Sequence, residues 1–147
     1  MMACPIEDRL AIEDRMVAYC TAVDAMEKPE NIAALFTTDA DFDLSGIGMA
    51  RASGRDGIRD FFAGVFSAMS HHAHYLTNFA LTDYDGETAS ARAYIIGMGR
   101  MRDGGEVTVH GRYYFNFRRV DGQWLASRYS MDFMMPLPGT LGAVQGG

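Results

Sequence analysis

The sequence is poor in cysteine and has no long apolar run. Cys4 and Cys20 are its two cysteines, and their spacing fits neither a CxxC redox motif nor a zinc knuckle. No uninterrupted apolar stretch approaches the roughly 18 residues that span a bilayer. The N-terminal segment MMACPIEDRLAIEDR carries charges where a secretory signal would be apolar. We therefore expect reduced thiols, a cytoplasmic location and no membrane partner.

Positive charge is also scarce. Lys and Arg number 13 against 19 for Asp and Glu, which gives a net charge of −6, and no local basic patch offsets it. Such a chain repels a polyanion, so nucleic acid is not an expected partner. The sequence also lacks a GxSxG nucleophile elbow, a Gly-rich phosphate loop and a dinucleotide fingerprint. Any chemistry is therefore expected to need no cofactor.

What is present is a globular composition in a length that suits one domain. The chain has 147 residues, of which 48% are hydrophobic and 22% charged. We predict a single domain over 1–147, with a core over about 6–133 and a loop or tail over 134–147, where PLPGTLGAVQGG is rich in proline and glycine. The 11 methionines suit either an adaptable core or the wall of an apolar pocket.

Three helices are predicted in the first half of the chain. The longest runs from Ile6 to Met26, a second, short helix lies in PENIAALF, and a third begins at Ser53 or Gly54. Between the last two, ADFDLSG and GMARASG read as a strand or hairpin. In the longest helix, Asp24 falls inside the apolar arc, where a carboxylate needs a partner. The residues that define this arc are Ile6, Leu10, Ile12, Met16, Val17, Tyr19, Cys20 and Val23, and Glu13 also lies within it.

The second half of the chain reads as four strands joined by hairpins. After Ser70 the apolar period changes from about 3.6 to 2, and turn signals recur in DYDGE, RDGGE and VDGQW. The expected fold is α+β, with a strongly curved, mixed or antiparallel sheet wrapped around the helices and a pocket at its open end. The predicted strands are about His71–Thr82, Thr88–Met101, Glu106–Val120 and Gln123–Met134.

Three of the four histidines lie in the stretch HHAHYLTN. If this stretch is a strand, His72, His74, Leu76 and Asn78 share one face. Two histidines on one face could hold a metal, with His110 as a third ligand, but no second ligand pair has a recognisable spacing. We therefore predict no metal site.

The alternative is a catalytic role for His74 with Asp24. A neutral imidazole acts as a general base near pH 7, and a carboxylate on its other ring nitrogen fixes the tautomer and stabilises the imidazolium. The sequence leaves open whether Asp24 instead caps a helix end or pairs with a basic residue.

Arginine and tyrosine side chains raise a similar choice. Arg112 and Arg128 are either surface ion pairs or fixed cations that hold an oxyanion or a leaving group. Tyr19, five residues before Asp24, is either a core tyrosine or a hydrogen-bond donor to substrate oxygen.

Several motifs together resemble the SnoaL-like branch of the nuclear transport factor two-like superfamily. They are YCTAVD, LFTTDADFD, GRDGIRDFF, HYLTNFALTDYDGETASARAY, GRYYFNFRRVDGQW and SRY, and they extend over about Ile6 to Phe133. The chain is similar to hexachlorocyclohexane dehydrochlorinase, scytalone dehydratase and bile-acid 7-alpha-dehydratase. The resemblance implies a cone-shaped, cystatin-like fold with a deep apolar pocket.

The resemblance also implies roles for four residues. The dyad aspartate falls on Asp24 and its histidine, in an H-x3-N pattern, on His74. Arg128 matches the arginine that assists the leaving group, and Tyr19 matches the tyrosine of Y-x4-D. The dehydrochlorinase has a lysine near the position of Tyr19, so an oxygen leaving group suits this chain better than chloride.

We therefore predict a cofactor-independent lyase or isomerase, dehydratase-like, that removes a proton from a small apolar substrate, aromatic or polycyclic. Its catalytic residues would be Asp24, His74, Arg128 and Tyr19. A non-catalytic binding protein for small hydrophobic molecules, or the small subunit of a ring-hydroxylating dioxygenase, are the alternatives. A homo-oligomer, dimer or trimer, is expected. The residues predicted to contact substrate are Asn78, His110, Arg112, Met131 and Phe133.

Overall fold

The computed structural model describes residues 1–136, so most of the predicted tail over 134–147 lies outside the described residues. Helices come first and long strands follow, as the change of apolar period predicts. The elements are α1 (Ile6–Ala25), α2 (Pro29–Ala33), β1 (Phe36–Asp43), a 3₁₀ turn (Ser45–Ile47), β2 (Arg51–Ser53), α3 (Gly54–Ala68), β3 (Met69–Tyr84), β4 (Thr88–Met101), β5 (Glu106–Val120) and β6 (Gln123–Phe133).

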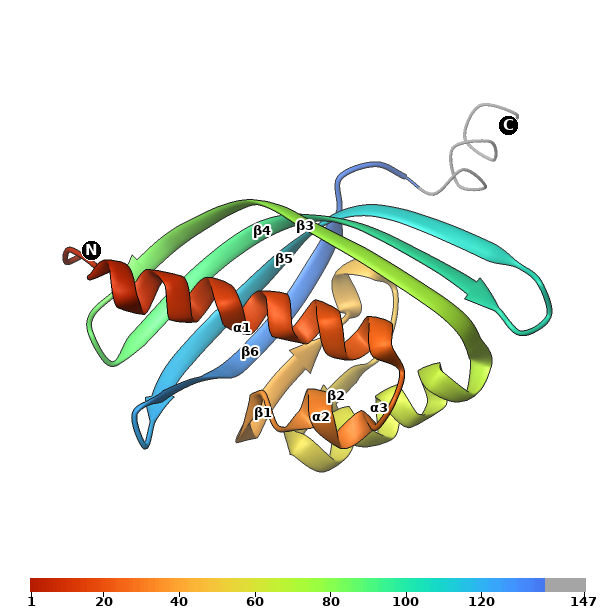
Figure 1. Ribbon diagram of the computed structural model, residues 1–147, viewed down its shortest axis with the longest axis horizontal. Helices are drawn as coiled ribbons and strands as arrows, with labels where there is room; N and C mark the ends of the chain where they lie inside the picture. The colour runs from red at the N-terminus through yellow and green to blue at the C-terminus, as the bar shows by residue number, and fades with distance from the viewer. Residues whose placement is uncertain (137–147) are drawn as a thin grey trace.

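The six strands form one mixed sheet in the order β2-β1-β6-β5-β4-β3. All neighbouring pairs are antiparallel except β1 and β6, which are parallel. Figure 1 shows the sheet curling over α1, which lies across its concave side, while α3 leads directly into β3. The α+β prediction is confirmed, and the hairpin in the first half is β1 with β2.

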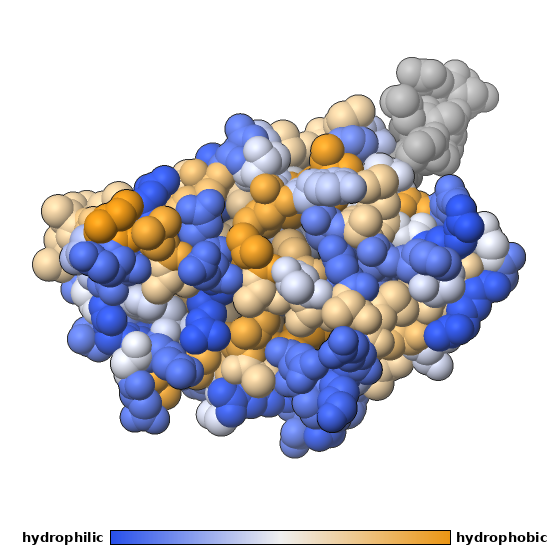
Figure 2. All heavy atoms as spheres, viewed as in Figure 1, coloured by the Kyte–Doolittle hydropathy of each residue, from blue (hydrophilic) through white to orange (hydrophobic). Residues whose placement is uncertain are grey.

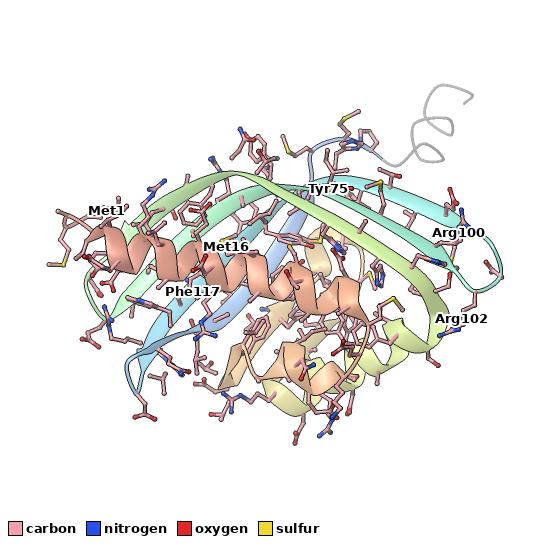
Figure 3. The ribbon with its side chains drawn as sticks, viewed as in Figure 1. Met1, Met16, Tyr75, Arg100, Arg102 and Phe117 are labelled. Atoms are coloured by element: carbon pink, nitrogen blue, oxygen red, sulfur yellow. The ribbon has the colours of Figure 1, made fainter. Side chains whose placement is uncertain are left out.

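The aromatic core fills the space between the helices and the inner face of the sheet. Phe42 on β1 stacks on Tyr129 of β6, with ring centroids 4.5 Å apart and planes at 16°. Met16 on α1 and Phe117 on β5 are both buried in this layer (Figure 3). Large rings that bury this much surface hold α1 against the sheet.

The predicted arc of α1 is partly wrong. Ile12, Met16, Tyr19, Cys20 and Val23 are buried, but Ile6, Leu10 and Val17 are about half exposed. Figure 2 shows hydrophobic surface along α1 on this side of the molecule. The sheet covers only one side of the helix, so an arc as wide as the predicted one cannot be buried completely.

Two β-bulges change which face some side chains occupy. In β3 the pairing with β4 shifts between Thr77 and Ala80, and Asn78 there has φ 55°, in the left-handed region. In β6 the pairing with β5 shifts at Ser127, so Phe117 pairs with Ala126 and the preceding residue of β5 with Arg128. An extra residue in a strand reverses the inward and outward alternation beyond it.

Candidate active site

The C-terminal end of α1 brings Asp24 to the inner face of β3. Oδ1 of Asp24 lies 2.5 Å from Nδ1 of His74, and the backbone N–H of His74 donates to Oδ2 at 2.9 Å. The α1 helix ends at Met26 in the left-handed conformation, directly after this contact. One carboxylate therefore fixes both the backbone and the imidazole of His74.

This contact determines the state of the histidine ring. A carboxylate on Nδ1 holds the proton there in the neutral ring, so Nε2 is the nitrogen free to accept a proton. A Cβ atom added at Gly97, opposite His74 on β4, would lie 3.2 Å from Nε2 and from Cδ2. Nε2 therefore faces the space that Gly97 leaves open.

The space beside His74 is a small apolar pocket. It has a volume of about 160 Å³ and is walled by strands β3 to β6 and by the 3₁₀ turn. His74 is 13% exposed and Asp24 28%, so the dyad is only partly screened from solvent. The lining residues are mostly aliphatic or sulfur-containing: Ile47, Met69, His72, His74, Ile95, Gly97, Met98, Gly99, Val107, Val109, Tyr113 and Met131.

A second histidine lies in the same pocket. His72 is two residues before His74 on the inner face of β3, and the two ring centroids are 5.9 Å apart. Burial lowers the pKa of His72, as does its neighbour His74, while Asp24 and the Val23 backbone act in the opposite direction. The sequence pattern correctly places His72 on the same face as His74. That His72 lines the pocket is seen only in the structure.

The tyrosine that reaches the pocket is Tyr113, and the sequence gives no signal that selects it. Tyr113 lines the pocket, whereas Tyr19 lies behind it among Phe36, Phe62 and Phe115. Burial raises the pKa of Tyr19 and of Tyr113 far above the ordinary value of 10. Both hydroxyls stay protonated at any ordinary pH, so Tyr113 can only donate or accept a hydrogen bond there as a neutral group.

A wider groove lies on the opposite face of β3, β4 and β5. It has a volume of about 450 Å³ and shares His72, Met98, Gly99 and Val107 with the pocket. Its other lining residues alternate along these strands with the residues of the pocket: His71, Ala73, Arg100, Glu106 and Thr108. The groove is therefore separate from the space beside His74.

Arg128 lies on the outer face of the sheet, away from His74. Its guanidinium donates to Asp41 and, at 3.0 Å, to Oδ2 of Asp43, while Arg51 contacts the same two carboxylates. The bulge at Ser127 places Arg128 on the face opposite to Trp124 and Ala126, whereas a regular strand would place all three on one face. Arg128, which was expected to supply a cation to the pocket, is thus part of an ion-pair network on the surface.

The predicted substrate-contacting residues divide between the two faces. Met131 lines the pocket. Phe133 lies on the same face of β6 but is not among the residues that line the pocket. Arg112 lies on the outer face, where its Nε donates to Asp132 at 3.0 Å. His110 precedes Arg112 by two residues in β5 and therefore lies on the outer face too. Asn78 is exposed in the bulge of β3, so the expected shared face with His74 is wrong.

Within residues 1–136, no group of three His, Cys, Asp or Glu side chains is placed to hold a metal ion. His72 and His74 therefore have no third ligand in that part of the chain. None of the helices in the described region is long and apolar enough to cross a membrane.

Comparison with solved structures identifies the fold. A candidate aromatic ring hydroxylase from Novosphingobium aromaticivorans matches with a TM-score of 0.90 and 60% identity, over 92% of this chain and 94% of that one. A candidate scytalone dehydratase from the same species has a TM-score of 0.80 and 24% identity, over 88% and 86% of the two chains. A hexachlorocyclohexane dehydrochlorinase from Novosphingobium barchaimii has 0.78 and 21%, over 91% and 92%. The two more distant matches establish the fold alone.

One sequence comparison identifies the family. No curated protein matches the chain. The SnoaL-like domain matches residues 5–130, nearly all of the described chain. With a curled six-stranded sheet, a pocket at its open end and a domain match of this extent, the chain belongs to the SnoaL-like family of the nuclear transport factor two-like fold.

Proposed function

We propose that this protein is a cofactor-independent lyase or isomerase that removes a proton from carbon in a small apolar substrate. The observation that carries the proposal is the pair of contacts between Asp24 and His74, at 2.5 Å and 2.9 Å, on the wall of an apolar pocket. A histidine held in one tautomer by a carboxylate, with its other nitrogen facing a pocket, is arranged as a general base.

The proton-transfer step follows from this geometry. Nε2 of His74 accepts the proton as the substrate C–H bond breaks, and the positive charge on the imidazolium is stabilised by the Asp24 carboxylate. General base catalysis of this kind contributes about 10²- to 10⁴-fold to the rate. The rest must come from orientation and from hydrogen-bond donors placed where negative charge develops.

Within the pocket, Tyr113 takes the donor role that was predicted for Tyr19. Its hydroxyl is buried and stays protonated, because burial raises its pKa. Tyr19 contacts the rings of Tyr113 and Tyr129 and supports them from behind. Arg128 has no part in the proposal, since Asp41 and Asp43 hold its guanidinium on the outer face.

The test uses 5-nitrobenzisoxazole, a flat apolar probe that opens when a base removes its one acidic C–H proton. The proton goes to the base, the electron pair of the C–H bond forms a nitrile, and the N–O bond breaks to give a coloured phenolate in the same molecule, so no cofactor is needed. We expect saturable opening by the protein and a loss of about 10²-fold or more in kcat/KM for His74→Ala, with unchanged circular dichroism. Absence of opening by the unmodified protein, or full activity in His74→Ala, would contradict the proposal and favour a non-catalytic binding protein.

A second candidate function is favoured by the relative with 60% identity. That protein is described as a candidate aromatic ring hydroxylase. This chain would then be the small subunit of a ring-hydroxylating dioxygenase, and a large, iron-containing partner subunit would supply the oxidant. Co-expression with such a subunit tests this: stable co-purification supports it, and purification as a self-contained homo-oligomer counts against it.

A further inference from the structure

We infer that Ile47 is a specificity-determining residue, which the 3₁₀ turn Ser45–Ile47 holds at the end of the pocket away from the strand of His74. The inference rests on the proposed function, because it takes His74 as the base from which the length of the substrate is counted. It narrows the predicted aromatic or polycyclic substrate to one that buries a single ring in the pocket.

Ile47 faces inward from a loop whose other residues face solvent. Its neighbours Gly46, Gly48 and Met49 are exposed, whereas Ile47 is partly buried against the core and lines the pocket. The rest of the pocket wall comes from strands in the order β6-β5-β4-β3. His74 lies on β3, the last of these strands, and the turn lies against β6, the first. Ile47 and His74 therefore bound the pocket from its two ends.

The backbone of the turn is held by hydrogen bonds within the loop. The carbonyl group of Leu44 accepts the N–H of Ile47 at 3.1 Å and the N–H of Met49 at 3.0 Å. The buried Asp43 side chain accepts the backbone N–H of Ser45 through Oδ1 at 2.9 Å. These contacts fix the direction in which the turn presents the Ile47 side chain.

Gly46 lets the turn approach β6 closely. A Cβ atom added at Gly46 would overlap the backbone carbonyl oxygen of Met131, which cannot swing aside as the end of a flexible side chain can. A larger residue at this position would therefore hold the turn further from β6. With glycine there, Ile47 is placed beside Met131 on a wall that is fixed by backbone contacts.

The chemistry of the side chain suits Ile47 to set a size limit. Three of the other lining residues are methionines, whose unbranched side chains adapt to what they contact: Met69, Met98 and Met131. A β-branched side chain such as that of Ile47 is stiff at χ1, so its volume stays in place. The stiff residues of β4 and β5 form the floor between the two ends and do not limit the length of a substrate.

The volume of the pocket gives the size of the buried part of a substrate. A cavity of about 150 Å³ binds benzene, and this pocket has a volume of about 160 Å³. One ring fills that space, so a further fused ring at the end away from His74 would collide with Ile47. A size difference of one methylene group in an apolar pocket changes kcat/KM by about 10- to 200-fold.

Two probes of different length test this inference. The shorter is 5-nitrobenzisoxazole, and the longer is the linear naphthisoxazole, which opens to a nitrile and a naphtholate by the same proton removal. Its added ring lies at the end away from the reactive C–H. We expect Ile47→Ala to raise the ratio of kcat/KM for the longer probe to kcat/KM for the shorter by about tenfold or more over wild type, chiefly through KM. Ile47→Val, a smaller change, should raise the ratio by less.

The matched control is Met49→Ala. Met49 is 47% exposed in the same loop and is not among the residues that line the pocket, so its truncation should leave the ratio unchanged. An unchanged ratio in Ile47→Ala, or an equal rise in Met49→Ala, would overturn the role of Ile47 while leaving the base in place. Naphthisoxazole that neither wild type nor Ile47→Ala opens would also overturn it. Wild-type protein that opens neither probe would instead overturn the proposed function.

Discussion

The inner and outer faces of the sheet use polar side chains in opposite ways. On the inner face, His72 and His74 stand among aliphatic residues and face an open pocket. On the outer face, Arg128 is 38% exposed and its guanidinium is shared between Asp41 and Asp43. A similar pair joins Arg112 to Asp132.

The difference shows why residue type alone does not identify a catalytic group. The arginines on the outer face already have carboxylate partners, and exposed pairs of this kind contribute only about 0–1 kcal/mol. The polar groups on the inner face are few, and burial changes the pKa of three of them, His72, Tyr113 and Tyr129. A pocket with unmatched polar groups and perturbed pKa values is the stronger indication of function.

Of the substitutions that test this difference between the two faces, Gly97→Ala on the inner face should lower the activity most. The added methyl group would lie 3.2 Å from Nε2 of His74, in the space where a substrate must approach. We expect kcat/KM for 5-nitrobenzisoxazole to fall by about 10²-fold, since a misplacement of about 1 Å at the reacting atoms has an effect of this size.

Gly64→Ala is the matched control for this variant. Gly64 lies in α3 with no atom within 4 Å of an added Cβ, so alanine there should leave the activity unchanged. Full activity in Gly97→Ala would show that substrate does not approach His74 from the β4 side.

The smallest effect is expected from Arg128→Gln. Because Arg128 lies on the outer face, kcat/KM should stay within about twofold, and the thermal midpoint should fall by only a few degrees. A loss of turnover comparable to that of His74→Ala would show that Arg128 takes part in catalysis. It would contradict the conclusion that only the inner face carries the active site.

The pH dependence of this variant gives a further check. The Ser45 hydroxyl and backbone N–H, with Arg128 and Arg51, lower the pKa of Asp43 to about 2 from its ordinary 3.8. This stabilisation is present above about pH 4 and is lost as the pH falls toward 2, when Asp43 becomes protonated. The difference in thermal midpoint between Arg128→Gln and wild type should therefore shrink over that range.

The sequence predicts most of the fold because periodicity follows directly from burial. The bounds of β4 and β5 are as predicted, and α1 ends one residue earlier than expected. The face of the sheet that each side chain occupies was harder to predict, because a single bulge reverses the alternation. Ser127 in β6 moves Arg128 outward, and Asn78 in β3 leaves the face of His74. No local pattern in the sequence specifies either bulge.

The site was partly predictable for a related reason. Asp24 was notable as an acid inside an apolar arc, and the structure places it in contact with His74. Tyr113 and Gly97 carried no such signal, since a tyrosine and a glycine in alternating strands are common. Their importance depends on which strands are neighbours, and the pairing of β3 with β4 and β4 with β5 brings them beside His74. These residues are far apart in the sequence, so their proximity could not be predicted from it.

The most direct test of the central claim is a double-mutant cycle on Asp24 and His74, measured as kcat/KM for 5-nitrobenzisoxazole. If Asp24 acts only by holding His74, His74→Ala should lose about 10²-fold or more, and Asp24→Asn should lose nothing further in the His74→Ala background. If the two losses instead multiply in the double variant, Asp24 and His74 act independently, and the dyad proposed for this protein is contradicted.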